Sequence, residues 1–341
     1  MADIEFVMVC PASKDNPRNS EAAVARLRDG RLLLAYTHFY GGAADQSPAF
    51  IGGKLSADGG RTWSPTFEMV PNDAAENVMS ASLLRLRSGP LALFFLRKNS
   101  DSDLRAYMRK SHDEGESWGD EIVVTFPPGY HVMNNDRVIQ LSSGRLLAPV
   151  SYSPDYRREN HFRNVCFYSD DEGLTWRRGA TFLDLPKRGA MEPGLVELKD
   201  GRVLQIIRTQ LGRIYRSFST DGGDTWSEPQ PTDIVSPESP ATITRLPAPA
   251  GDLLLVWNNN SSGAVSLRPR CPLTAAISRD EGETWEHVRD LETDSRLNYA
   301  YVSVTFPEPE TALLTYWVDD RPAVGISLKA ARVPTGWFYH A

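Results

Sequence analysis

Cysteine is scarce in this sequence of 341 residues, which contains three: Cys10, Cys166 and Cys271. They are odd in number, far apart and without the C-x-x-C spacing of a metal or redox site, so free thiols that are buried or partly buried are expected. The six histidines show no metal-ligand spacing either. The sequence therefore predicts neither a metal site nor another cofactor.

Long apolar runs and an excess of positive charge are also missing. No run reaches the roughly 18 residues that span a bilayer, and the start, MADIEFVMVCPASKD, lacks the pattern of a signal peptide. We therefore expect a cytoplasmic protein without a membrane contact. The net charge of −7 argues against nucleic-acid binding, which needs a basic surface. No segment has helical periodicity over more than about three turns, and strand patterns predominate, so the fold is expected to be all-β.

One eight-residue motif, Ser-x-Asp-x-Gly-x-Thr/Ser-Trp, occurs five times. The copies are SADGGRTW, SHDEGESW, SDDEGLTW, STDGGDTW and SRDEGETW, which begin at Ser56, Ser111, Ser169, Ser219 and Ser278. Their separation of roughly 50 to 60 residues is the period of one four-stranded propeller blade. The Asp carboxylate can accept backbone N–H groups in a tight turn, Gly can adopt positive φ, and Trp can pack the hairpin onto its own blade. We interpret these Asp boxes as structural.

A second repeat precedes each box and consists of two apolar strands joined by a turn. Its clearest copies are AVARLRDGRLLLAY, SLLRLRSGPLALFF, RVIQLSSGRLLAPV and LVELKDGRVLQII; TITRLPAPAGDLLLVW and VSVTFPEPETALLTYW are looser copies. Six hairpins with five boxes predict a single domain over residues 1–341, a six-bladed β-propeller with four-stranded antiparallel blades. The N-terminal IEFVMV is expected to supply the strand that closes the last blade, because ring closure removes open sheet edges.

Five boxes at this spacing resemble those of the sialidase (neuraminidase) superfamily, and the resemblance covers nearly the whole chain. The resemblance implies the fold more firmly than the chemistry, because the same box occurs in propellers that are not enzymes. It also implies that the active site lies on the face opposite the boxes. There, the starts of the first strands and the loops after the second strands would supply its residues.

Three arginines match the positions at which sialidase-like enzymes hold a substrate carboxylate: Arg18, Arg208 and Arg270. The forked guanidinium group suits bidentate binding of a carboxylate. Arg268 is an alternative to Arg270, because both precede the same predicted strand.

The same resemblance assigns Tyr301 as nucleophile, Glu192 as its base and Asp45 as general acid and base. A neutral phenol avoids repulsion by a substrate carboxylate, but its ordinary pKa of about 10 means that it must be activated. Tyr301 lies in AYVSV, which is similar to the family's Tyr-x-Ser-x pattern. Tyr299 is the alternative nucleophile and otherwise a predicted substrate contact.

Some features depart from the family. Arg18 is followed by Asn-Ser where the family has Ile-Pro, and the stretch HVMNNDRV has no equivalent that we know. We interpret Asn135, Asp136 and Arg137 of that stretch, together with His38, as substrate-binding residues around a central funnel. The alternative is a polar loop whose Asn side chains bond to the backbone. A polar ring of this kind suits a hydroxyl-rich ligand and leaves the identity of the acidic sugar open.

These features predict an exo-acting glycoside hydrolase that releases a terminal acidic sugar from a carbohydrate partner, by a retaining mechanism with a tyrosine nucleophile. One alternative is a polysaccharide lyase acting on a uronic acid, in which His38, His131 or a tyrosine abstracts the α-proton. Another is a propeller that binds glycans without cleaving them. The oligomeric state stays open.

Overall fold

The computed structural model describes residues 3–261 and 270–340, and within them the fold is all-β, as the sequence predicts. The one helical element in these ranges is a short 3-10 helix, η1 (Thr335–Tyr339). No helix in the described part is long and apolar enough to cross a membrane.

The strands form four sheets. Two sheets are four-stranded and antiparallel. One has the strand order β15 (Met191–Glu197), β16 (Val203–Arg208), β17 (Arg213–Ser219), β18 (Gln230–Val235). The other has the order β19 (Thr242–Arg245), β20 (Leu253–Asn258), β21 (Leu273–Ser278), β22 (Glu286–Glu292). The eight-stranded sheet comprises β1 (Glu5–Cys10), β2 (Arg18–Arg26), β3 (Leu32–Phe39), β4 (Ala49–Ser56), β5 (Phe67–Val70), β23 (Asn298–Glu308), β24 (Thr311–Asp319) and β25 (Ile326–Pro334). The nine-stranded sheet comprises β6 (Asn77–Arg85), β7 (Leu91–Ser100), β8 (Asp103–Ser111), β9 (Ile122–Val123), β10 (Tyr130–Val132), β11 (Ile139–Gln140), β12 (Leu146–Ser153), β13 (Arg163–Ser169) and β14 (Arg177–Arg178).

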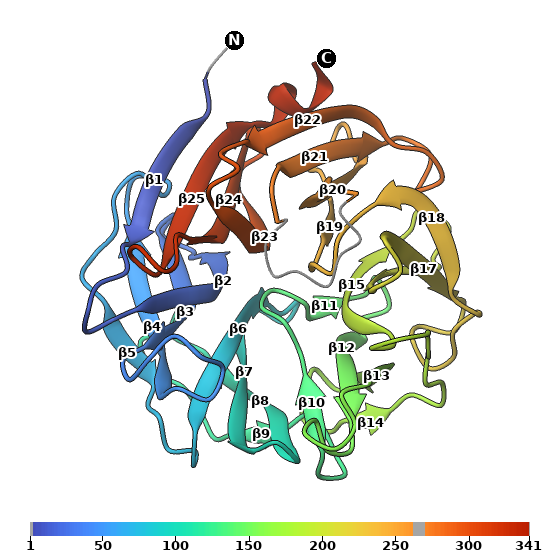
Figure 1. Cartoon of the computed structure of the whole chain (residues 1–341), viewed down its shortest axis with the longest axis horizontal. Coiled ribbons are helices and arrows are strands. Elements are labelled where there is room, and N and C mark those ends of the chain that lie inside the picture. Colours follow the sequence, from blue (N-terminus) through green and yellow to red (C-terminus); the bar gives the residue numbers. More distant parts are fainter. Residues whose placement is uncertain (1–2, 262–269, 341) are drawn as a thin grey trace.

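The sheets are arranged radially around a centre. Figure 1 shows β2, β6, β15, β19 and β23 nearest the centre, and β5, β9, β14, β18 and β22 at the rim. In each of the two large sheets, a single parallel residue pair joins two antiparallel groups: Arg18 with Ile326, and Tyr130 with Leu104. The starts of the innermost strands therefore surround one central region.

The N-terminal strand lies where the sequence predicts it. β1 pairs antiparallel with β25, in a register that sets Glu5 opposite Arg332 and Val7 opposite Ala330. This pairing adds a fourth strand to the group β23-β24-β25 and joins the two ends of the described chain in one sheet (Figure 1).

The Asp boxes form the turns that their residues predict. In the first box, Asp58 accepts the backbone N–H of Thr62 at 2.9 Å and its hydroxyl at 2.6 Å, while the Ser56 hydroxyl accepts the N–H of Gly60. Gly60 has φ of +93°, where a β-carbon would be strained. The carboxylate thus closes the turn.

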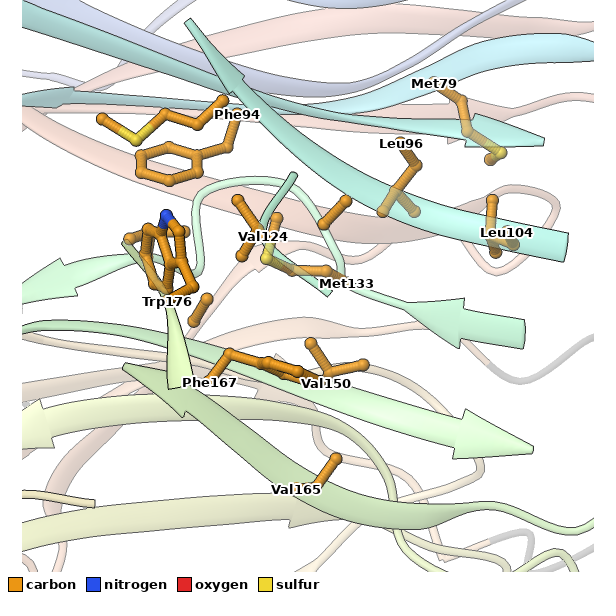
Figure 2. Packing of buried hydrophobic residues seen from close by; sticks show 14 of the residues in the cluster. Met79, Phe94, Leu96, Leu104, Val124, Met133, Val150, Val165, Phe167 and Trp176 are labelled. Carbon is orange, nitrogen blue, oxygen red and sulfur yellow. The ribbon is translucent and has the colours of Figure 1, made fainter. Parts of the chain in front are cut away.

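The box tryptophans pack against the preceding repeat as well as onto their own, a wider role than the sequence predicts. The ring of Trp176 meets that of Phe94 on β7 edge to face, with centroids 6.0 Å apart. Figure 2 shows these rings in one cluster with Met133 and Phe167, between strands of neighbouring repeats. The box therefore fixes one repeat against the next, which holds the central ends of the strands in place.

Candidate active site

A cavity of about 440 Å³ lies at the central ends of the innermost strands. None of its described lining residues belongs to an Asp box. Its lining includes all six residues that the family resemblance assigns to carboxylate binding and catalysis: Arg18, Asp45, Glu192, Arg208, Arg270 and Tyr301. The fold thus brings together residues that lie up to 283 positions apart, from residue 18 to residue 301.

A β-bulge in four innermost strands turns one side chain of each strand into this cavity. The pairing shifts register between Ser20 and Ala23 of β2, Met79 and Ser82 of β6, Met191 and Gly194 of β15, and Ala300 and Ser303 of β23. Inside these bulges, Glu21, Ser80, Glu192 and Tyr301 have φ of 55°, 56°, 38° and 57°. Such backbone costs about 1–3 kcal/mol per residue and is concentrated at functional sites, where bulges re-aim side chains.

Tyr301 and Glu192 form a hydrogen-bonded pair. The Tyr301 hydroxyl donates to Glu192 Oε1 at 3.5 Å, and Arg208 donates to the other oxygen of the same carboxylate. Burial raises the pKa of Tyr301 to about 12, with Glu192 acting in the same direction and Arg270 and Arg208 against it. Burial acts to raise the pKa of Glu192, but Arg208, together with Arg270 and Asn134, holds that pKa below its usual value. Glu192 is therefore a carboxylate positioned to take the Tyr301 proton.

The three arginines differ in how far their charge is neutralised. Arg18 contacts Asp45 at 2.6 Å and Glu21 at 3.4 Å. Arg208 contacts Glu192, and Glu238 at 3.4 Å. Among the described residues, Arg270 forms no ion pair; it donates to the Glu238 carbonyl oxygen at 3.4 Å. The guanidinium of Arg270 is thus the least compensated of the three.

Asp45 lies at the mouth of the cavity, in the loop between β3 and β4. Its side chain is 66% exposed, whereas that of its partner Arg18 is 6% exposed. The Arg18 guanidinium holds the pKa of Asp45 below its usual range. The Asn77 amide donates to the Asp45 backbone oxygen at 2.9 Å and so ties the loop to β6.

Two other predicted site residues do not line this cavity. His38 stacks on Phe50 with centroids 4.6 Å apart, and its ring nitrogen lies 3.1 Å from the Tyr36 hydroxyl. The Tyr299 ring is buried against Tyr316, which places Tyr301 rather than Tyr299 at the cavity. Arg268, the alternative to Arg270, lies outside the described residues.

The predicted polar wall, Asn135 to Arg137, also lies away from the cavity. Asn135 Nδ2 donates to the backbone oxygens of Ala22 and Tyr301, at 2.6 and 3.1 Å. Asp136 and Arg137 line a second cavity of about 350 Å³ instead. Asn135 therefore fits the alternative interpretation, a polar segment whose Asn side chains bond to the backbone. Asp136 and Arg137 face the second cavity rather than the first.

Several cavity residues are not evident from sequence reasoning. Glu21 is 4% exposed and accepts hydrogen bonds from the hydroxyls of Ser80 and Ser20, at 3.0 and 3.1 Å; burial raises its pKa. Arg188 contacts Glu238 and lies against the Phe162 ring. A wall is formed by Leu96, Leu104, Tyr130, Tyr156 and Phe162. Aligning SEAA, MSAS, MEPG and AYVS across the repeats would have drawn attention to Glu21 and Ser80.

The described residues include no group of three or more His, Cys, Asp or Glu side chains placed to hold a metal ion. The cavity lining offers carboxylates, guanidinium groups, serine hydroxyls and phenols, among them that of Tyr301. Such a set can bind an anion, transfer protons and form a covalent bond through the Tyr301 oxygen.

Comparison with known proteins agrees with the repeat. A family described as a BNR repeat-like domain matches residues 39–308. A sialidase of Micromonospora viridifaciens is 29% identical over 292 residues, which cover 75% of this chain and 43% of that protein. The chain therefore spans less than half the length of that relative.

Solved structures share the fold at lower identity. A protein of unknown function from Dyadobacter fermentans has a TM-score of 0.77 at 18% identity, over 98% of this chain and 100% of the other. A Trypanosoma rangeli sialidase with 2,3-difluorosialic acid, described as a covalent intermediate, has a TM-score of 0.76 at 18% identity, over 97% of this chain and 59% of the other. Together with the family match, these comparisons show that the chain belongs to the BNR repeat-like family of the sialidase superfamily.

Proposed function

We propose that this protein is a glycosidase of the sialidase type, which releases a terminal acidic sugar from a glycan with retention of configuration. One set of contacts carries the proposal: the Tyr301 phenol donates to the Glu192 carboxylate, which Arg208 helps to keep ionised. A protein that only binds glycans has no need of a phenol placed beside a base.

In the proposed reaction, Arg18, Arg208 and Arg270 hold the carboxylate of the sugar. The Tyr301 oxygen bonds to the anomeric carbon, the phenolic proton passes to Glu192, and the glycosidic bond breaks as Asp45 protonates the leaving oxygen. Water then attacks the anomeric carbon and gives a proton to Asp45, while Tyr301 leaves and regains its proton from Glu192. Two displacements at one carbon give overall retention.

The relatives support this proposal without deciding the sugar. The Micromonospora viridifaciens protein is named a sialidase, and the Trypanosoma rangeli structure is a covalent intermediate with a fluorinated sialic acid. We propose the same kind of intermediate on Tyr301 here. The glycan that this chain acts on, and any partner of the whole protein, are part of the proposal.

The experiment that tests the proposal is covalent trapping. With 2,3-difluorosialic acid, Tyr301 would displace fluoride from C2, and the fluorine left at C3 would slow hydrolysis of the product. We expect mass spectrometry to find one sugar per chain, on the peptide that contains Tyr301. Tyr301→Phe should show no label, while Tyr299→Phe, whose ring lies outside the cavity, should label like the wild type.

Turnover is measured in parallel with aryl glycosides of sialic, ketodeoxynononic and uronic acids. Tyr301→Phe should lose about 10³-fold or more in kcat and still fold, because it lacks the nucleophile. Wild-type turnover in Tyr301→Phe would contradict the assignment. A product with an ultraviolet-absorbing conjugated double bond would indicate a lyase, and tight binding of intact glycans without cleavage would indicate a binding protein.

We further propose that the fold is a six-bladed propeller and a single domain over residues 1–341. Each large sheet would then be two blades joined by its single parallel pair. The group β23-β24-β25 with β1 would be the sixth blade.

A further inference from the structure

The segment that contains Asn135, Asp136 and Arg137 crosses the centre of the molecule behind Tyr301. Its contacts reach the innermost strands of four other repeats, at the following backbone or side-chain atoms: Ala22 of β2, Ala81 and Ser82 of β6, Ala241 and Thr242 at the start of β19, and Tyr301 and Val304 of β23. Asp136 and Arg137 also line the second cavity, whose lining has no residue in common with that of the active-site cavity. The segment therefore forms the floor between the two cavities.

Arg137 is a buried guanidinium whose hydrogen bonds go to neutral oxygen atoms. Its Nη1 donates to the Thr242 hydroxyl at 3.2 Å and its Nη2 to the Ala241 carbonyl oxygen at 3.0 Å; its Nε has no partner. Among the described residues, no carboxylate lies within ion-pair distance of it. Arg18 and Arg208, in contrast, each contact two carboxylates. A buried charge with no carboxylate in direct contact is costly, so the negative groups further away determine how well it is stabilised.

Two negative groups face Arg137: the Asp136 carboxylate in the floor itself, and the Tyr301–Glu192 pair on the other side of the floor. The charge of Arg137 interacts first with its neighbour Asp136, whose carboxylate accepts the Val304 N–H at 3.2 Å, and then with Glu192 and Tyr301. The Thr242 hydroxyl that accepts from Arg137 donates in turn to the backbone oxygen of Val302, at 2.7 Å, next to Tyr301. Asn135 holds the backbone oxygen of Tyr301 itself. Two hydrogen-bond routes thus connect the floor to the bulge that carries Tyr301.

We propose that Arg137 is a positioning residue for the Tyr301–Glu192 pair: from the floor behind it, the guanidinium keeps the pair anionic, and Asn135 fixes the bulge that aims Tyr301. This inference rests on the proposed function, in which the pair must hold one proton between its two oxygens before it can attack. A pair that has gained a second proton has no base and cannot activate the phenol.

The pH at which the Tyr301–Glu192 pair gains its second proton sets the acidic limb of the pH profile of kcat/KM. The charged and titratable groups that face Tyr301 are Glu192 and Arg208 from β15 and β16, Arg270 before β21, Arg18 and Glu21 from β2, and Arg137. Behind Arg137 lies Asp136, whose pKa burial raises to about 6 against the effect of Arg137, so its titration is followed in the same variants. Removing one positive charge from this set makes the second proton easier to add. For Arg137→Met we expect the acidic limb of kcat/KM to move up by about 0.5 to 1 pH unit, with KM little changed because Arg137 does not line the active-site cavity.

The test compares four proteins with an aryl sialoside between about pH 2.5 and 8, because the limb of a carboxyl with a lowered pKa lies at the acid end: wild type, Arg137→Met, Arg137→Lys and Arg245→Met. In Arg137→Lys the acidic limb should lie at the same pH as in the wild type, because lysine keeps the positive charge. Arg245 lines the same second cavity but pairs with Glu281 at 2.7 Å, so Arg245→Met should leave the limb in place. Arg137→Gln, which keeps hydrogen-bonding capacity, replaces Arg137→Met if the latter does not fold.

A direct titration separates this inference from the proposed function. The carboxyl carbon of Glu192, identified by its loss in Glu192→Gln, is followed by ¹³C NMR in the absence of substrate. In Arg137→Met we expect the midpoint of the Glu192 titration to rise by about 0.5 to 1 pH unit. This expectation does not depend on which substrate the enzyme takes. An unchanged midpoint in a folded Arg137→Met protein, or an equal shift in Arg245→Met, would overturn the inference. Absence of turnover in the wild type would count against the proposed function alone.

Discussion

Asp45 and the substrate carboxylate would compete for the same guanidinium. Asp45 contacts Arg18 at 2.6 Å, and this contact keeps the pKa of Asp45 low. In the proposed mechanism, however, Asp45 must donate a proton. A sugar carboxylate that takes over Arg18 would release Asp45 and let its pKa rise towards its ordinary value, so that substrate binding itself prepares the acid.

This argument predicts how Asp45→Asn and Asp45→Ala behave towards different leaving groups. For an alcohol, which leaves only when protonated, we expect kcat/KM to fall by about 10² to 10³-fold. For 4-nitrophenol, which leaves as a stable anion, the loss should stay below about tenfold. The comparison needs only initial rates on a sialyl oligosaccharide and on the nitrophenyl glycoside. Equal losses on both substrates would contradict the role of Asp45 as the acid.

The pH dependence of the wild type follows from the same contact. Because Arg18 depresses the pKa of Asp45, the free protein holds Asp45 as a carboxylate at neutral pH. For the alcohol leaving group, kcat/KM should therefore increase as pH falls from 8, until the Tyr301–Glu192 pair takes up its second proton. The nitrophenyl glycoside should show a flatter profile over the same range. A profile for the oligosaccharide that rises towards alkaline pH would refute this assignment.

The sequence predicts which types of residue lie at the site, but it does not predict the complete set of residues that line the cavity. Arg18, Glu192 and Tyr301 follow from blade, strand and family pattern. Glu21 escapes such reasoning, because its side chain reaches the cavity through a bulge that reverses the alternation of β2. His38 and Tyr299 fail in the opposite way: each lies near the correct strand end, yet packing turns its ring into neighbouring aromatic residues.

Among the elements, the box hairpins join neighbouring repeats through one glutamate. Glu114, Glu172 and Glu281 occupy the fourth position of their boxes and accept the backbone N–H of Arg28, Ser88 and Lys199 in the hairpin turn of the preceding repeat, at 2.8, 3.1 and 2.8 Å. The fourth box has Gly222 at this position, and there Glu197 of β15 bonds to Ser142 N at 2.7 Å instead. The box pattern predicts the turn, whereas this contact between repeats emerges only from the assembled sheets.

Replacing these glutamates should lower stability in a pH-dependent way. The pKa of Glu281 is lowered to about 2, first of all by its hydrogen bond with Arg245, and the pKa values of Glu114 and Glu172 are lowered as well. Groups with depressed pKa values stabilise the fold above their unfolded pKa, and this contribution is lost as pH falls through the folded value. The triple variant Glu114→Gln, Glu172→Gln, Glu281→Gln should therefore lose about 1 kcal/mol per site at pH 7. It should lose less near pH 3, which lies below the unfolded pKa of a glutamate but still above the folded pKa of Glu281.

Chemical denaturation at the two pH values measures this difference. Glu116→Gln is the matched control, since Glu116 lies in the same box as Glu114 but is exposed to solvent. It should leave the free energy of unfolding unchanged at both pH values. An equal loss for the triple variant at pH 7 and pH 3 would mean that the charges of the three glutamates do not stabilise the contacts between repeats.

For the whole molecule, the pairing of β1 with β25 is the contact that ties the start of the described chain to its end (Figure 1). Val9 and Cys10 are each 5% exposed and belong to one cluster with Leu328 and Ala330 of β25 and with Tyr36 of β3. The apolar run and the need to cover a sheet edge made this strand predictable from the sequence. Its energetic weight depends on the cluster, which the sequence does not reveal.

Deleting residues 1–10 should therefore weaken the whole fold rather than one end of it. The deletion uncovers the edge of β25 and the apolar cluster, for a loss of about 4 kcal/mol from the buried side chains. For a chain of 341 residues this corresponds to a Tm lower by about 5 °C. Glu5→Ala is the control: it removes the contacts of Glu5 with Arg61 and Arg332 but keeps the strand, so its Tm should change by less than about 1 °C. Calorimetry should show one transition for each protein, because repeats that share their cores through the box tryptophans unfold together. Two separate transitions would contradict a single domain. An unchanged Tm after the deletion would show that β1 does not hold the ends of the chain together.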